Sequence, residues 1–227
     1  MITIIVPTYN ESKNLPILVK DLLKIKAIRI LVVDDNSPDG TGEIAEKLKK
    51  TCRRVNVLHR KNKSGLGSAI LDGFKAAETD IVGVMDADLS HPPETLRRMI
   101  EKIKDYDVVV ASRYIPGGGA DEKWTKLRRL ISKSAILLVK PIAKIKDPMS
   151  GFFLVKKSVI DGVSINPDSC KICLEIMVKG KYKNFIEVPF IFINRKAGKS
   201  KIMTPKEISR YIRHVMNLYV HSIRKKF

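Results

Sequence analysis

The stretch Asp80–Glu94, DIVGVMDADLSHPPE, decides the fold that this sequence predicts. It begins with a short apolar run, Ile81–Met85, which is typical of a buried parallel strand. The run ends in two carboxylates one residue apart, Asp86 and Asp88, and Pro92–Pro93 then favour the start of a helix. Ligands of open α/β sheets bind beyond the carboxyl ends of the strands, and paired carboxylates there can hold a Mg²⁺ or Mn²⁺ that in turn holds a diphosphate. For this pair alone, solvated loop acids remain the alternative.

Apolar runs alternate with helical patterns on both sides of this stretch. We expect buried strands at 2–8, 28–33, 55–58, 81–85 and 108–111, and helices at 14–25, 41–50, 65–77 and 93–104. This alternation predicts an α/β protein with βαβ units, a mostly parallel central sheet flanked by helices, and right-handed crossovers. The pattern breaks after residue 112. Beyond it we expect a basic, apolar stretch at 124–145, strands at 152–156 and 187–193, and a C-terminal helix at 205–223.

Length and cysteine content set broad limits. At 227 residues the chain can bury a full core, which predicts one domain. It has no run of eighteen apolar residues and starts on an apolar strand without a charged leader, so we expect neither a membrane span nor a signal peptide. Three cysteines cannot form a disulfide framework, which indicates a reducing cytosol. The pair Cys170 and Cys173 lacks the four ligands of a structural zinc site.

The net charge of +19 is concentrated in two segments. Lys123–Lys157 and Arg195–Phe227 each contain ten basic residues and one acid, so together they carry 18 of the 19 charges. Such localised charge indicates an anionic partner, which can be a phosphate, a nucleic acid or an anionic membrane surface. A non-catalytic nucleic-acid-binding protein is the alternative from another class. We expect no nucleic-acid partner, because the aromatic residues do not interleave with the basic clusters as base stacking requires.

Polar residues follow three of the expected strands. They are Pro7–Glu11, Asp34–Asp35, and the pair Asp86 and Asp88. The ends of parallel strands meet at one edge of the sheet, where carboxylates can accept hydrogen bonds from a base or a ribose. The loop at Gly65 is a weak phosphate signal, because it lacks the Lys-Ser/Thr of a P-loop. Together these ends predict a nucleotide site, whereas each alone is also compatible with a capping turn.

These motifs together resemble the inverting family 2 glycosyltransferases with a GT-A fold, and within them the dolichyl- or polyprenyl-phosphate mannosyltransferases. The resemblance rests on IIVPTYNESKNL, VVDDNSPDGT, GLGSA, MDADLSHPPE, ASRY, RRLIS, DPMSGF and R-x-x-G-x-S-K, which extend from residue 2 to about 202. It implies a GT-A catalytic domain over residues 1–202. The pattern of residues 203–227 predicts a basic amphipathic helix. Such a pattern is typical of an interfacial helix and of a helix docked on a core, and we expect docking together with membrane contact.

The resemblance also implies roles for individual residues. Nucleotide-sugar contacts would come from Pro7, Tyr9, Glu11, Asp35, Asp86, Arg195 and Lys201. Asp86 and Asp88 would hold the metal, Mg²⁺ or Mn²⁺. The acceptor phosphate would be received by Arg113, Arg128 and Ser132, and the residues expected to carry catalysis are Asp88, Arg113 and Arg128. The chain departs from the pattern at Ser90, where some relatives carry Gln as a third metal ligand, and at Phe152–Phe153, where the motif often continues into Arg.

The implied reaction moves a hexose to a polyprenyl or dolichyl phosphate with inversion, and the expected donor is GDP-mannose. A phosphomonoester is largely ionised at neutral pH, so this acceptor needs positioning and charge neutralisation more than a strong base. Arginine suits that task because its guanidinium binds phosphate oxygens bidentately. A UDP-sugar such as UDP-glucose, or a different acceptor, is the alternative within the family.

A lipid acceptor predicts a peripheral protein on the cytosolic face of an anionic membrane, and leaves open a membrane-embedded protein partner. In the C-terminal helix we expect one apolar stripe, formed by Ile208, Ile212, Val215, Tyr219 and Ile223.

His91, next to Pro92, is expected to be a cap or turn residue rather than a catalyst.

Overall fold

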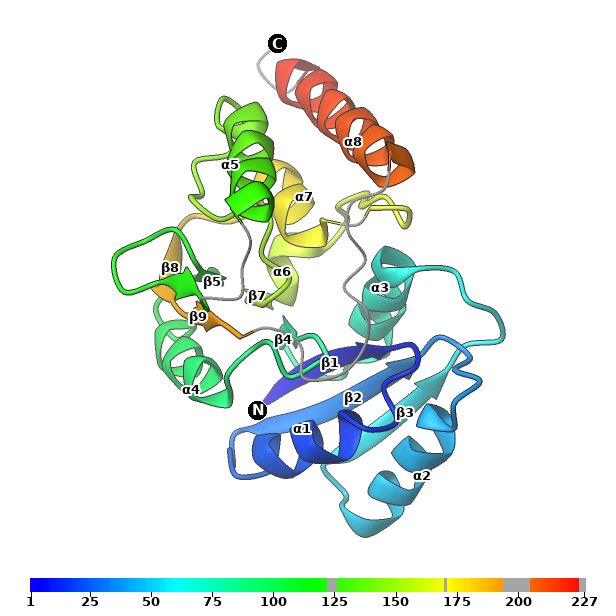
Figure 1. Cartoon of the computed structure of the whole chain (residues 1–227). Coiled ribbons are helices and arrows are strands. Elements are labelled where there is room, and N and C mark those ends of the chain that lie inside the picture. The colour runs from blue at the N-terminus through cyan, green and yellow to red at the C-terminus, as the bar shows by residue number, and fades with distance from the viewer. Residues whose placement is uncertain (122–125, 170, 194–204, 225–227) are drawn as a thin grey trace.

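The computed structural model describes residues 1–121, 126–169, 171–193 and 205–224, with only the backbone described for 126–129 and 205–207. Its main feature is a seven-stranded sheet in the order β3-β2-β1-β4-β7-β5-β8 (Figure 1). The strands are β1 Ile2–Thr8, β2 Ile28–Asp34, β3 Val55–His59, β4 Ile81–Val84, β5 Val108–Ser112, β7 Phe153–Lys156 and β8 Phe185–Pro189. A small parallel pair, β6 Gly119–Ala120 and β9 Ile191–Phe192, lies beside it.

The N-terminal half of the sheet is parallel, which confirms the predicted βαβ units. β1 pairs in parallel with β2 on one side and with β4 on the other, and β2 pairs in parallel with β3. The carboxyl ends of β2, β1 and β4 are therefore neighbours at one edge of the sheet, as predicted.

The second half departs from the simple pattern. β7 is inserted antiparallel between β4 and β5, and β8 then pairs in parallel with β5. The strand expected at 187–193 begins earlier and is divided into β8 and β9. The division lies at Phe190, which is buried. The Phe190 N–H donates to the Ser112 carbonyl, and the Phe190 carbonyl accepts the Gly119 N–H. This crossing carries the chain from the main sheet to the small one.

Helices cover both faces of the sheet, because its strands are apolar on both sides. Ile4 and Val6 point into one core, which α1, α2 and α4 complete, whereas Ile5 and Val82 point into the other, which α3 and α5–α8 complete. The helices are α1 Leu15–Leu22, α2 Thr41–Thr51, α3 Leu66–Ala76, α4 Pro93–Lys102, α5 Lys126–Val139, α6 Lys157–Ile160, α7 Ile172–Lys179 and α8 Pro205–Arg224. The basic, apolar stretch after residue 124 thus contains a helix, α5, that its sequence pattern did not predict.

α5 and α8 lie side by side at one end of the molecule (Figure 1). The hydroxyls of Tyr211 and Tyr219 on α8 donate to the carbonyls of Ala135 and Leu138 on α5, each at 2.8 Å. No helix within the described ranges is long and apolar enough to cross a bilayer.

The apolar stripe expected on the C-terminal helix is only partly buried. Val215 is buried against the core and Tyr219 is partly buried, whereas Ile208, Ile212 and Ile223 are exposed. The core-facing residues of α8 are Tyr211, Val215 and Leu218, and its exposed apolar residues are Ile208, Ile212, Met216, Val220 and Ile223. The apolar arc is therefore wider than a docked helix requires, and part of it faces outward.

Candidate functional site

Asp34 braces the first two turns at the edge of the sheet. Its buried carboxylate accepts hydrogen bonds from the Thr8 hydroxyl (2.9 Å), from the Ser37 hydroxyl (2.6 Å) and from the Ser37 N–H (3.1 Å). The Asn10 N–H donates in turn to the Ser37 hydroxyl at 3.1 Å. The end of β1 and the end of β2 are thus joined by side chains, so a ligand here would meet a preformed wall.

The same wall continues through Glu11 and Asp39. The Glu11 N–H donates to the Thr41 hydroxyl (2.9 Å), and the Ser12 N–H donates to Asp39 (3.1 Å). Burial raises the pKa of Asp39, but hydrogen bonds from Thr41 and Ser12 outweigh it and hold that pKa below its usual range. The Glu11 carboxylate accepts a hydrogen bond from the Asn14 amide at 2.7 Å. Asn14, the N-cap residue of α1, therefore orients the Glu11 carboxylate.

Asp35 organises the loop that leads into α3. Its buried carboxylate pairs with the Arg60 guanidinium at 2.6 Å and accepts the N–H groups of Ser64 (3.2 Å) and Gly65 (3.1 Å). Arg60 also pairs with Asp72 at 3.1 Å, so it joins β3 to α3. Sequence reasoning missed Arg60, because an isolated basic residue after a strand carries no motif. The nucleoside contact expected of Asp35 stays a prediction, since its oxygens already bind this loop.

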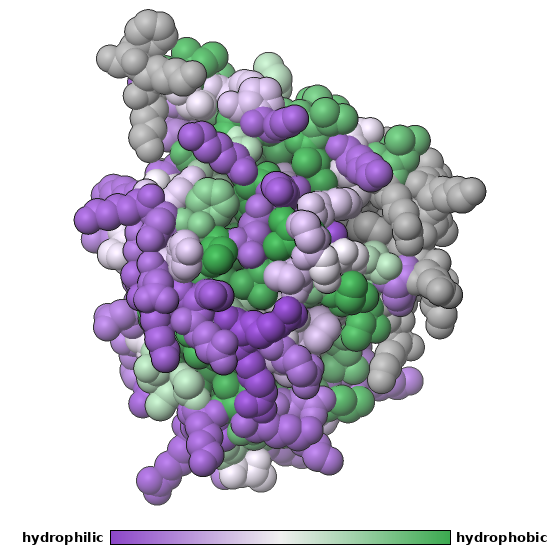
Figure 2. Space-filling model, turned by 90° about the vertical axis from the view of Figure 1, so that its left-hand side faces the viewer, coloured by the Kyte–Doolittle hydropathy of each residue, from purple (hydrophilic) through white to green (hydrophobic). Residues whose placement is uncertain are grey.

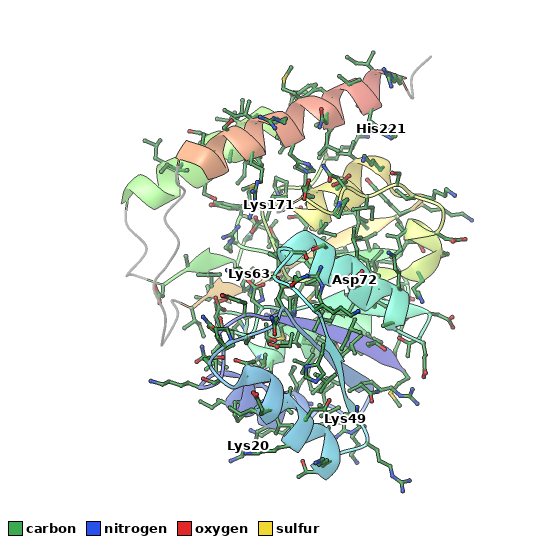
Figure 3. All side chains as sticks on the ribbon, turned by 90° about the vertical axis from the view of Figure 1, so that its right-hand side faces the viewer. Lys20, Lys49, Lys63, Asp72, Lys171 and His221 are labelled. Atoms are coloured by element: carbon green, nitrogen blue, oxygen red, sulfur yellow. The ribbon has the colours of Figure 1, made fainter. Side chains whose placement is uncertain are left out.

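Tyr9 lies under the same loop. The ammonium of Lys63 is 3.5 Å from the centroid of the Tyr9 ring, a cation–π contact. Pro7, half-buried near the end of β1, precedes this tyrosine by two residues. Figure 3 shows Lys63 on the segment before α3, with Asp72 on that helix. An open cavity of about 590 Å³ is lined by residues of this loop, of the end of β3 and of α3, among them Arg60 and Asp72.

Asp86 and Asp88 follow β4 in a tight turn. Asp88 is buried, and its carboxylate accepts the Ser90 N–H at 3.1 Å. Leu89, between Asp88 and Ser90, has a φ of 64°, a left-handed conformation that residues other than glycine rarely adopt. Gly151, from the turn before β7, faces Asp86: a Cβ there would lie 3.6 Å from a carboxylate oxygen. The absence of a side chain on Gly151 thus keeps space open in front of the Asp86 carboxylate.

This arrangement fits a hard divalent cation. The Asp86 carboxylate is partly exposed and faces Gly151, whereas the Asp88 carboxylate is buried behind it in the same turn. The described part of the chain contains no group of three or more His, Cys, Asp or Glu that could hold a metal, so the other ligands would have to come from the substrate and water. Mg²⁺ and related ions are often held by one or two carboxylates, with substrate phosphates and water as the other ligands. Ser90, which replaces a glutamine ligand of some relatives, has a buried hydroxyl without a hydrogen-bond partner among the described residues.

His91 is a turn residue, but it does not cap α4, whose N-cap is Pro92. Its buried ring stacks on Phe152, with centroids 4.8 Å apart, and meets the edge of Phe190. The Asp86 N–H donates to His91 Nδ1 at 3.1 Å. Burial lowers the pKa of His91, although the Asp86 charge opposes that shift. The hydrogen bond that Nδ1 accepts requires that this nitrogen carry no proton.

Arg113 is anchored by a buried acid. Its Nε and Nη2 atoms donate to the two oxygens of Asp147, each at 2.8 Å, and its N–H donates to the same carboxylate at 2.9 Å. Burial lowers the pKa of Arg113, but the hydrogen bonds and charge of Asp147 outweigh it and leave that pKa raised. Glu187 on β8 fixes Asp147 in turn, by accepting its N–H at 3.1 Å. The DPMSGF turn therefore holds the guanidinium in one orientation.

The structure brings α5 to the residue next to this arginine. The hydroxyl of Tyr114, next in the chain to Arg113, donates to the Ser132 hydroxyl on α5 at 2.7 Å. Arg128 lies one helical turn before Ser132 in α5, and its side chain is outside the described atoms. Arg195 and Lys201, expected to contact the donor phosphates, lie outside the described residues.

Comparison with known proteins supports a single family. The profile of the glycosyl transferase family 2 matches residues 3–163. The dolichol-phosphate mannosyltransferase of Pyrococcus furiosus is 45% identical over 225 residues, which are 96% of this chain and 63% of the relative. The dolichol-phosphate mannosyltransferase of Saccharomyces cerevisiae is 36% identical and matches 96% of this chain and 86% of its own length. The resemblance inferred from the motifs is thereby confirmed.

A solved structure confirms the predicted fold class. A mannosyltransferase from Pyrobaculum calidifontis, determined in complex with GDP-Man and Mn²⁺, superposes with a TM-score of 0.66 over 98% of this chain and 64% of its own. Its sequence identity of 18% makes this a likeness of fold. The chain thus spans less than two thirds of the length of the Pyrobaculum mannosyltransferase and of the Pyrococcus relative.

Proposed function

This chain belongs to glycosyl transferase family 2, and we propose that it transfers a hexose, with GDP-mannose as the donor, to the phosphate of a polyprenyl or dolichyl lipid. One observation carries the proposal. The turns after β1, β2 and β4 meet at one edge of the sheet, and Arg113 is held by the turn that faces Asp86. A donor diphosphate and an anionic acceptor would both find suitable partners there.

The donor half of the site would be formed by the first three strand ends. Tyr9 and Glu11 would contact the nucleoside, together with the loop that Asp35 organises. Asp86 and Asp88 would hold Mg²⁺ or Mn²⁺, which supplies charge neutralisation for the diphosphate leaving group when it is bound. The bound Mn²⁺ of the Pyrobaculum neighbour supports a divalent ion in this role.

The acceptor half would be formed by Arg113, Arg128 and Ser132. An oxygen of the ionised lipid phosphate attacks the anomeric carbon, the bond from that carbon to the diphosphate oxygen breaks, and GDP leaves. A single displacement inverts the anomeric configuration. No proton has to be removed from the nucleophile, so the arginines act by orienting it and by offsetting its charge.

A lipid acceptor places α5 and α8 at a membrane. The exposed apolar residues of the two helices include Leu137, which is 67% exposed, and Leu138, which is 50% exposed. Figure 2 shows the side of the molecule that lies on the left in Figure 1. Apolar surface is more frequent toward its upper end, where α5 and α8 lie, and hydrophilic surface is more frequent below. Lys20 and Lys49 lie at the opposite end in Figure 3. We assign the domain 1–202 to catalysis and the helix within 203–227 to peripheral contact with the cytosolic face of an anionic membrane.

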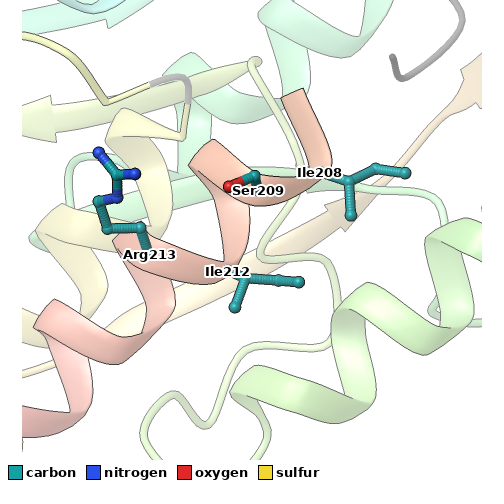
Figure 4. A pocket seen from close by; sticks show the side chains of 4 residues that line it. All are labelled: Ile208, Ser209, Ile212 and Arg213. Atoms are coloured by element: carbon teal, nitrogen blue, oxygen red, sulfur yellow. The ribbon is translucent and has the colours of Figure 1, made fainter. Parts of the chain in front are cut away.

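An open pocket beside α8 supports this orientation. It has a volume of about 460 Å³ and is lined by Ile208, Ser209, Ile212 and Arg213. In Figure 4 the two isoleucines point toward α5, whereas Arg213 points away from it. Apolar side chains toward α5 and a cation beside them suit a lipid with an anionic head group.

The test is a transfer assay with the full chain. GDP-[³H]mannose, Mn²⁺ and polyprenyl phosphate in anionic liposomes should give label that extracts into organic solvent, with inverted anomeric configuration, and UDP-[³H]glucose should give far less. Asp86→Asn should abolish the product. Lipid-linked label from the UDP-sugar alone would correct the donor, and no lipid-linked label from either donor would overturn the proposal.

A further inference from the structure

The main-chain N–H of Asp86 lies where the sheet stops providing partners. The pairing of β4 with β1 ends with the Met85 N–H, which donates to the Ile5 carbonyl at 3.1 Å. The next N–H, that of Asp86, turns away from the sheet and donates to His91 Nδ1. Histidine thus supplies the acceptor that the strand lacks, and it closes the turn that contains both metal-binding candidates.

The ring that accepts this hydrogen bond is firmly held. It stacks on Phe152 with an interplanar angle of 12° and meets the edges of Phe190 (5.7 Å between centroids) and Phe192 (6.2 Å). Phe152 immediately precedes β7, Phe190 lies between β8 and β9, and Phe192 ends β9, so separate parts of the chain fix one imidazole. A flat side chain fills the space between these rings, and an acceptor atom at the position of Nδ1 is needed to bind the Asp86 N–H.

The same ring also faces the carboxylate of Asp86. With Nδ1 as acceptor, the proton of the neutral ring lies on Nε2, which is 3.8 Å from Asp86 Oδ2. That distance is too long for a hydrogen bond, but the N–H dipole attracts the carboxylate. The turn needs such support, because Leu89 adopts its left-handed conformation within it and Asp88 binds the Ser90 N–H.

We propose that His91 is a positioning residue for the metal site, which orients the Asp86 carboxylate by accepting the Asp86 N–H on Nδ1. This inference rests on the proposed function, because it assigns His91 to the divalent cation that the donor diphosphate requires. His91 does not touch the substrate in this assignment. Residues that orient a metal ligand commonly change metal affinity by about 10–100-fold when they are replaced.

Three substitutions separate the acceptor from the ring. His91→Asn keeps an acceptor at the distance of Nδ1 but loses the ring, His91→Gln moves the acceptor to the position of Nε2, and His91→Phe keeps the ring without an acceptor. His59, an exposed histidine paired with Glu46, provides a matched control as His59→Phe. A merely structural role predicts that His91→Phe is the mildest change, whereas the positioning role predicts that His91→Asn is.

The readout is Mn²⁺ affinity at saturating GDP, measured by electron paramagnetic resonance with the full chain, beside the free energy of unfolding. We expect His91→Phe and His91→Gln to weaken Mn²⁺ binding about tenfold or more, and His91→Asn to remain much closer to wild type. His91→Phe should nevertheless be the most stable of the three variants, and His59→Phe should not change Mn²⁺ affinity. Equal Mn²⁺ affinities for His91→Phe and His91→Asn would overturn the inference.

A second measurement does not depend on the metal. ¹⁵N NMR of histidine-labelled protein should show His91 as the tautomer protonated on Nε2, with Nδ1 as acceptor. A proton on Nδ1 would overturn the inference, whatever the titrations show. If wild type shows that Nε2 tautomer but binds no Mn²⁺ with GDP, the proposed function fails, and His91 is left with a structural role only.

Discussion

The buried ion pair between Arg113 and Asp147 gives the most quantitative prediction. The Asp147 side chain is 0% exposed and that of Arg113 is 10% exposed, and two parallel hydrogen bonds of 2.8 Å join them. Breaking a buried pair by removing one partner costs about 3–5 kcal/mol, because the remaining charge stays buried without compensation. A natural domain is stable by only about 5–15 kcal/mol, so each single substitution should remove a large part of that total.

The experiment is a double-mutant cycle. Arg113→Met and Asp147→Leu are made singly and together, and the free energy of unfolding is measured by urea denaturation with linear extrapolation. Replacing both charges by apolar groups leaves no unpaired charge, so the double variant should be more stable than either single variant. The control is the exposed pair Arg29–Glu78, whose coupling energy should stay within about 1 kcal/mol. Additive losses at Arg113 and Asp147 would refute the reasoning, because they would mean that neither charge depends on the other.

Three further predictions concern other parts of the molecule. Gly67→Ala should lower the free energy of unfolding by about 1–3 kcal/mol, because the added Cβ would lie 2.1 Å from the Ser169 carbonyl oxygen. The same substitution stabilises most helices, so a variant that is more stable than wild type in urea denaturation would contradict this prediction. The protein should sediment with anionic liposomes at low salt, and replacing Leu137 and Leu138 by Ser should weaken the salt-resistant part of that binding; equal sedimentation of both forms at all salt concentrations would exclude these leucines from membrane contact. Burial lowers the pKa of His214 below 6.5, so its protonation favours the unfolded chain and stability falls as the pH drops below about 6.5; His214→Gln should flatten that fall in urea titrations at several pH values, and an unchanged slope would contradict the assignment.

Much of the fold could be predicted because its strands are buried on both faces. Ile2–Thr8, Ile28–Asp34 and Ile81–Val84 are nearly continuous apolar runs, and the turns that follow them carry recognisable polar motifs. The antiparallel insertion of β7 could not be read in the same way. Phe153–Lys156 is as apolar as a parallel strand, and only its long-range partners β4 and β5 determine its direction. α5 was missed because a basic, apolar stretch does not reveal its periodicity until one face is buried.

In the candidate site, too, some residues could be predicted from the sequence and others could not. Motifs singled out Asp86, Asp88 and Arg113 as candidates, because acids and arginines that directly follow buried strands stand at the edge where ligands of α/β sheets commonly bind. The contacts that orient these residues come from segments remote in sequence: Asp147 is 34 residues from Arg113. His91 is near in sequence, but its function depends on the stacking with Phe152, which no local pattern indicates. Sequence patterns therefore predict chemical groups better than they predict the residues that hold them.

The central claim is that a divalent cation on Asp86 and Asp88 binds a nucleoside diphosphate at this edge of the sheet. The most direct measurement is calorimetric titration of GDP with and without Mn²⁺, for wild type, Asp88→Asn and Asp80→Asn. Asp80 is an exposed acid immediately before β4, at the opposite end of the strand, so Asp80→Asn makes the same change in charge away from the site. We expect Mn²⁺ to tighten GDP binding in wild type and in Asp80→Asn, and to have little effect in Asp88→Asn. An undiminished effect of Mn²⁺ in Asp88→Asn would contradict the account.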